Sequence, residues 1–77
     1  MATVTLVTDK HGTITIFASE ELAKKSVEFS CHKLPGMITY GESEDGTIHA
    51  DYMDGVNPPR LEATLENVHV FDRVTHL

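Results

Sequence analysis

The stretch TVTLVTDKHGTITIF, residues 3–17, decides the fold of this 77-residue chain. Threonine alternates with aliphatic residues in its first and last thirds, and a period of two is typical of a half-buried strand. The segment Asp9-Lys10-His11-Gly12 between them has the composition of a turn, with a glycine available for positive φ. Residues 3–17 are therefore predicted to form a β-hairpin. We expect inward-facing side chains at Val4, Leu6, Ile14 and Ile16, and water-facing threonines at Thr5, Thr13 and Thr15.

A helix is predicted directly after the hairpin, near residues 20–33. Ser19 is a good N-cap, and Glu20 and Glu21 place negative charge in the first turn, where the helix dipole favours it. Pro35 and the glycine after it stop the helix. One broad apolar arc is expected to face the sheet. Its members are Leu22, Ala23, Ser26, Val27, Phe29, Ser30, Cys31 and Leu34.

A second hairpin is predicted after the helix. Residues 37–40 and 47–52 flank an acidic turn that contains Asp45-Gly46, and an Asp-Gly pair is a strong hairpin signal. On the second of these strands Ile48, Ala50 and Tyr52 share one face. Pro58 and Pro59 then exclude a central strand in the loop that follows.

The last segment, residues 60–74, has an alternation that changes phase. Leu61-Glu62-Ala63-Thr64-Leu65 alternates in one phase and Val68-His69-Val70 in the other. Either a β-bulge or a tight turn near Glu66-Asn67 would reconcile the two.

The predicted order is two strands, one helix, and two or three further strands, in a single domain spanning residues 1–77. A lone helix with one apolar arc covers one face of a sheet. The fold class is therefore α+β: an antiparallel or mixed sheet of roughly four to six strands with one amphipathic helix packed on it. This order resembles the ubiquitin-like (β-grasp) plan of a hairpin, a helix across the sheet and further strands. The resemblance is one of pattern and implies no carrier role, because the sequence ends Thr75-His76-Leu77 without a Gly-Gly tail.

Composition points to a cytoplasmic protein, either of a cell or of a virus acting in its host's cytoplasm. Cys31 is the single cysteine, so no intrachain disulfide can form. The N-terminus lacks the basic and apolar regions of a signal peptide, and the apolar runs are far shorter than the roughly 20 residues that span a bilayer.

The excess negative charge lies in the second half of the chain. Residues 1–36 contain four acids and four bases, whereas residues 37–77 contain eight acids against Arg60 and Arg73, a difference of −6. A field of one sign attracts basic surfaces and repels nucleic acid and anionic membrane. We therefore expect a basic protein partner, with neither direct nucleic-acid nor membrane binding.

The sequence favours a protein that is not an enzyme and carries no cofactor. Cys31 falls near a helix C-terminus, where the dipole opposes a thiolate. No phosphate-binding loop, nucleophile elbow or zinc-ligand spacing is present. A metal-binding or pH-responsive site at His49 and His69, with Asp51 nearby, is an alternative.

The function predicted from these observations is a small acidic protein-binding module. One specific version is a phage-type inhibitor that blocks the nucleic-acid-binding surface of a host defence or transcription protein, its carboxylates standing in for phosphates. The rival prediction is a self-associating accessory subunit, a homodimer formed through the sheet. The carboxylates of the later hairpin are expected to form one contiguous outward wall, with Phe17 beside the outer-face residues. The predicted partner-binding residues are Glu42, Glu44, Asp45, Asp51, Asp54, His49, Met53, His69 and Phe71.

Overall fold

A computed structural model describes residues 2–70, which form five strands and one helix. The elements are β1 (Ala2–Asp9), β2 (Ile14–Phe17), α1 (Glu20–Ser30), β3 (Met37–Glu42), β4 (Ile48–Met53) and β5 (Arg60–Val70). The strands form one sheet in the order β2-β1-β5-β4-β3, and every neighbouring pair is antiparallel. The predicted α+β class and the order of its elements are confirmed, with no parallel pair in the described sheet.

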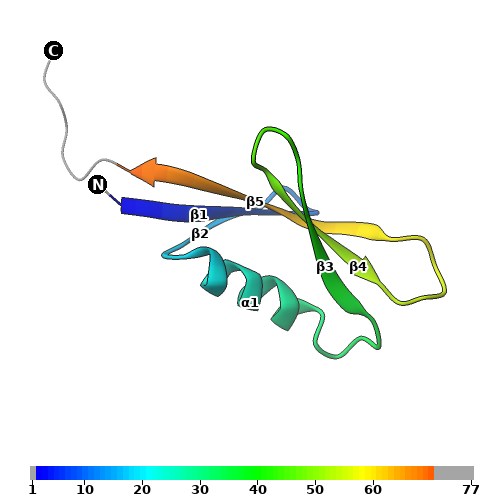
Figure 1. Ribbon diagram of the computed structural model, residues 1–77. Coiled ribbons are helices and arrows are strands. Elements are labelled where there is room, and N and C mark those ends of the chain that lie inside the picture. The colour runs from blue at the N-terminus through cyan, green and yellow to red at the C-terminus, as the bar shows by residue number, and fades with distance from the viewer. Residues whose placement is uncertain (1, 71–77) are drawn as a thin grey trace, which may run out of the picture.

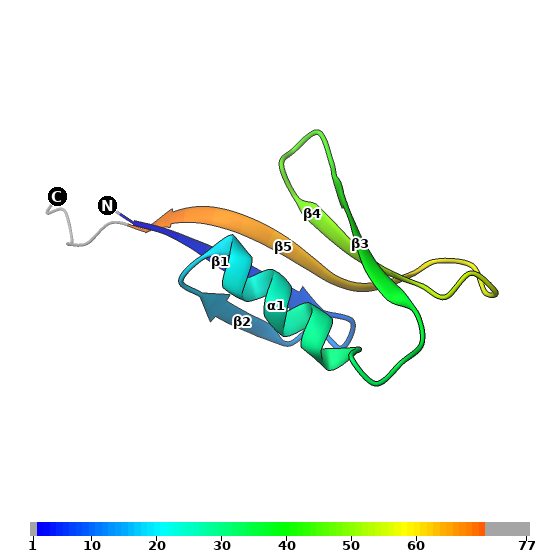
Figure 2. The same cartoon turned by 60° about the horizontal axis from the view of Figure 1, so that its bottom comes forward.

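Helix α1 lies on one face of the sheet, across the half formed by β1, β2 and β5 (Figures 1 and 2). Very small side chains lie in the core between the helix and the sheet. Ala23 of the helix and Ala50 of β4 are fully buried, and Ala63 of β5 is 4% exposed. Small residues allow the backbones of a helix and a sheet to approach closely, at the cost of a thin core. The buried cluster comprises Val7, Ala23, Val27, Ile48, Ala50, Ala63 and Leu65, with Phe17, Ile38 and Tyr40 packed against it.

The helix begins where the sequence predicts and ends three residues earlier. The Ser19 hydroxyl accepts a hydrogen bond from the backbone N–H of Leu22 at 3.2 Å, as an N-cap does. At the other end the Ser30 hydroxyl donates to the carbonyl of Val27, and the His32 ring lies 2.6 Å from the carbonyl of Phe29. These side chains satisfy carbonyls that a longer helix would bond internally, so α1 stops at residue 30.

The predicted apolar arc of this helix is too wide. Ala23, Val27 and Cys31 are buried, whereas Leu22 and Phe29 are 49% and 69% exposed. A narrow stripe of buried side chains is enough to pack the helix on the sheet, because the helix covers only about half of it.

The predicted facing of the first hairpin is wrong. Thr5 and Val7 of β1 point toward the helix and are buried, whereas Val4 and Leu6 lie on the opposite face. On β2 the register pairs Ile16 with Leu6, which places the β2 isoleucines on that opposite face too. Aliphatic residues occupy both faces of this hairpin, so alternation alone could not identify the buried one.

The last strand is continuous from Arg60 to Val70, and its irregularity lies elsewhere than predicted. The register between β4 and β5 shifts between Ala50 and Asp51, opposite Glu62. This bulge places Glu62 and Ala63 together on the helix side. No bulge or turn is present near Glu66-Asn67. The change of phase has another cause: Leu65 faces the helix while Val68 lies on the other face.

Candidate functional site

The face of the sheet opposite α1, the open face, is covered by no described element (Figure 1). Its apolar side chains gather over β2, β1 and the second half of β5. Cross-strand neighbours build this cluster: Ile16 pairs with Leu6, and Val4 pairs with Val68. The open-face patch consists of Val4, Leu6, Ile14, Ile16, Val68 and Val70.

The open-face patch is well exposed. Ile14 is 61% exposed, Ile16 65% and Val70 43%, while Leu6 lies half-buried between its neighbours. A second apolar group, Met37, Met53 and Leu61, lies at the far end of the same face and is 40–65% exposed. An antiparallel sheet with one face in water normally alternates apolar and polar residues, and exposed apolar clusters of this kind are a common feature of interaction sites.

The ionisable groups of the open face are acidic, apart from one histidine. Glu66 lies beside Leu6, and Asp51 lies between Thr39 and Leu61. His49 occupies the same face of β4. Among the described strand positions of this face there is no lysine or arginine.

The predicted wall of carboxylates is not contiguous. Glu44 and Asp45 lie in the turn between β3 and β4, and Glu42 ends β3 on the helix side. Asp54 follows β4 at the other end of that hairpin, and Asp51 alone lies on the open face between them. The five groups are therefore divided between two ends and two faces.

The remaining predicted contact residues are also divided. His49 and Met53 lie on the open face with Asp51, as expected. His69 pairs with Thr3 on the helix side, where its Nδ1 lies 3.2 Å from the threonine hydroxyl, so it does not meet His49. Phe17 packs against the core on the helix side, contrary to the prediction. Phe71 lies outside the described residues.

A serine–histidine pair at the end of the second hairpin was not foreseen from sequence. The Ser43 hydroxyl lies 2.8 Å from Nε2 of His49, a distance suited to a nucleophile and its base. The carboxylate of Asp45 beside them accepts a hydrogen bond from the backbone N–H of Thr47, which lowers its pKa, and the charge of His49 adds a smaller effect. The turn joining β3 to β4 brings together residues that are six apart in sequence. Within residues 2–70 no carboxylate hydrogen-bonds to the His49 ring, so the pair lacks the third group that orients the base of a catalytic triad.

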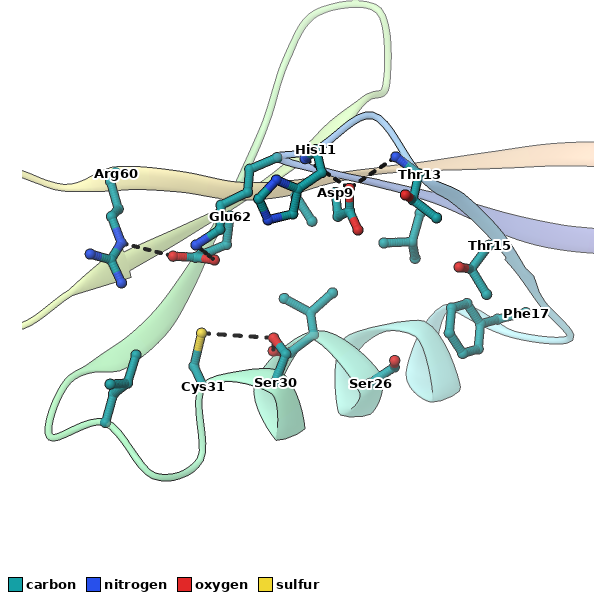
Figure 3. A pocket seen from close by; sticks show the side chains of 15 residues that line it. Asp9, His11, Thr13, Thr15, Phe17, Ser26, Ser30, Cys31, Arg60 and Glu62 are labelled. Carbon is teal, nitrogen blue, oxygen red and sulfur yellow. Dashed lines mark hydrogen bonds and ion pairs between the residues drawn. The ribbon is translucent and has the colours of Figure 1, made fainter.

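A cleft of about 330 Å³ separates the second half of α1 from the sheet (Figure 3). Glu62, which is 7% exposed, points into it from the bulge of β5. Its carboxylate accepts a hydrogen bond from Nε of Arg60 at 2.8 Å and pairs with Nζ of Lys10 at 3.3 Å. Burial alone would raise the pKa of Glu62, but its two basic partners outweigh burial and lower it.

The cleft holds several reactive groups that are engaged elsewhere. Glu62 is held ionised between two cations, which makes it a weak general base. The Ser30 hydroxyl donates to a backbone carbonyl, and the buried thiol of Cys31 lies 3.8 Å from that hydroxyl (Figure 3). Within residues 2–70, no hydroxyl or thiol of the cleft bonds to an imidazole or a carboxylate.

In the described part of the chain, no three or more histidine, cysteine or carboxylate side chains converge as a metal site would require. The helix that the structure describes is too short and too polar to cross a bilayer.

Comparisons with known proteins assign no relative to this chain. No family model, no curated protein and no solved structure matches it. The geometry of the open face and of the cleft is therefore the basis for any statement about what the protein does.

Proposed function

We propose that this chain is a non-catalytic protein-binding module that docks through its open face. Its partner presents apolar side chains flanked by lysine or arginine. The observation that carries the proposal is the open-face patch, in which Ile14 and Ile16 are 61% and 65% exposed. Removing apolar surface from water favours association, and the gain is largest where such side chains are contiguous.

The charge of the open face supports a basic partner. Glu66 lies inside the apolar region, beside Leu6, and no lysine or arginine on the described strand positions of this face compensates it. A carboxylate that is covered by a partner without a cation loses its hydration at a cost of several kcal/mol. A lysine or arginine on the partner offsets that cost and also speeds encounter with a chain of net charge −6.

The more specific version, an inhibitor that occupies a nucleic-acid-binding groove, remains a prediction. Its support is the overall charge and the absence of a lysine or arginine between Lys33 and Arg60. The five carboxylates proposed to stand in for phosphates are spread over two ends and two faces of one hairpin. That arrangement favours docking by the apolar open face over mimicry of a phosphate backbone.

The proposal is tested with two extended peptides used as probes. One alternates leucine with lysine, and the other alternates leucine with glutamate at the same length. We expect the lysine peptide to shift amide signals of β1, β2 and the second half of β5 in NMR titrations, and the glutamate peptide to leave them unchanged. Equal binding of both peptides would remove the basic-partner proposal.

A pair of matched variants locates the contact. Ile16→Lys places a cation in the open-face patch and should abolish the shifts produced by the lysine peptide. Leu22→Lys makes the same change at a residue of α1 that is 49% exposed and should leave them intact. Loss of binding in Leu22→Lys alone would move the contact to the helix and overturn the proposal.

A further inference from the structure

The second half of β5, residues 66–70, has a strand partner on one side only. β1 pairs with β5 from Asp9↔Ala63 to Ala2↔Val70, whereas β4 pairs only with residues 60–65. Both ribbon views show β1 and β5 continuing toward the chain ends, beyond the hairpin of β3 and β4 (Figures 1 and 2). A strand presents N–H and C=O groups to both sides, so within the described residues this half of β5 leaves backbone groups unpaired.

We propose that this free edge pairs with the same edge of a second copy of the chain. The two β5 strands run antiparallel about a two-fold axis at Val68. Val68 then lies opposite Val68 of the second copy, Asn67 opposite His69, and Glu66 opposite Val70. The product is a continuous ribbon of four strands, β1-β5-β5-β1, in which both strands of the new pair have neighbours on both sides.

The sequence of the edge is complementary to itself. Glu66 is the one carboxylate among these five residues, and the two-fold axis places it opposite a valine. The two Glu66 side chains are four residues apart along the ribbon, about 13 Å at the rise of an extended strand. Lysine and proline, which natural edges use to prevent pairing, are absent from residues 66–70.

Pairing at the edge agrees better with the charges than stacking of two open faces does. Stacking would enclose Glu66 and Asp51 of both copies in one interface that has no lysine or arginine on its described strand positions. Edge pairing leaves both carboxylates in water. It also joins the two open-face patches into one surface, because Val68 of each copy becomes a cross-strand neighbour of the other. The dimer therefore goes beyond the proposed function by offering a partner two adjacent docking surfaces.

Charge-reversal variants at the axis test the pairing. Val68→Lys and Val68→Glu each place two like charges directly opposite, at a Cβ separation of about 5 Å. We expect sedimentation equilibrium to give the dimer mass for the natural chain at high concentration and the monomer mass for each variant alone. An equimolar mixture of the two variants should regain the dimer mass, since Lys then faces Glu. Far-ultraviolet circular dichroism confirms that each variant is folded.

A matched control separates edge pairing from face stacking. Val4→Lys adds the same charge to the open face, but the two lysines lie three strand spacings apart, about 14 Å, across the proposed ribbon. The dimer should survive this change. A natural chain that stays monomeric at high concentration, a mixture that fails to regain the dimer, or a dimer lost equally in Val4→Lys would each overturn the proposal. None of these outcomes depends on the peptide titrations, so the proposed function is judged separately.

Discussion

The hydroxyl of Thr5 donates a hydrogen bond of 2.5 Å to the side-chain oxygen of Asn67. Thr5 is 1% exposed, and the amide nitrogen of Asn67 in turn donates to Glu20 at 2.8 Å. The hydrogen bond from Asn67 and then the pairing with Lys24 lower the pKa of Glu20. A chain of polar side chains thus links β1 and β5 to the first turn of the helix.

The two ends of the Thr5–Asn67 bond are not equivalent. Asn67→Ala leaves the buried hydroxyl of Thr5 without its acceptor, and we expect it to lower the free energy of unfolding by about 1–3 kcal/mol. Thr5→Val removes the buried hydroxyl itself and leaves only an exposed amide that water can solvate, so its effect should be smaller. Urea denaturation of both variants checks the difference. A larger loss in Thr5→Val would contradict this explanation.

Gly36 should not tolerate a side chain. Its N–H donates to the hydroxyl of Tyr52 at 2.8 Å, and a Cβ there would meet the carbonyl oxygen of Met53 and the Tyr52 ring, the latter at 2.6 Å. Gly36→Ala is expected to lower the free energy of unfolding by about 1–3 kcal/mol, because backbone atoms must move. Gly41→Ala is the control, since a Cβ at that glycine meets nothing within 4 Å. Chemical denaturation of the two variants compares them directly.

Asp54 should titrate well below an ordinary aspartate. Its carboxylate accepts hydrogen bonds from the backbone N–H groups of Asn57 and Val56 and from the Asn57 side chain, which lower its pKa from 3.8 to about 2. Because the folded pKa lies below the unfolded one, the resulting stabilisation is present above about pH 4 and is lost as the pH falls toward 2. NMR titration of the side-chain carboxyl measures this directly. A midpoint near 3.8 would show that the loop does not hold these bonds in solution.

Glu62 should contribute to the acid sensitivity of the fold. Its pKa is lowered, so its ion pairs stabilise the protein above its ordinary value of 4.5 and are lost as the pH falls through the folded value. Glu62→Gln should be less stable than the natural chain at pH 7, and the gap should narrow in acid. Glu66→Gln, on the open face, serves as the control. Denaturation at several pH values compares the three proteins, and a gap that widens in acid would exclude this role.

The sequence alone predicts the elements and their order, since local signals specify them. Ser19 and the two glutamates after it mark the helix start, and the Asp45-Gly46 pair marks the second hairpin. On β4, polar and apolar side chains truly alternate, and its predicted buried face of Ile48, Ala50 and Tyr52 is confirmed.

The open-face patch could not be predicted, because aliphatic residues occupy both faces of β1 and do not identify which face is buried. In β1, Val4 and Leu6 alternate with Thr5 and Val7, so either assignment of faces fits the pattern. The register with β5 decides it by placing Leu65 beside Val7. Pairing between residues nearly sixty apart leaves no trace in local periodicity.

The alanines where helix and sheet meet leave this protein little freedom to vary. Ala23 and Ala50 are fully buried, so an added methylene at either would meet packed neighbours, whereas Ala63, which is 4% exposed, borders the cleft. A bulkier residue would displace α1 from the sheet and widen the cleft beside it. The helix and the sheet can therefore stay this close only while Ala23 and Ala50 remain small.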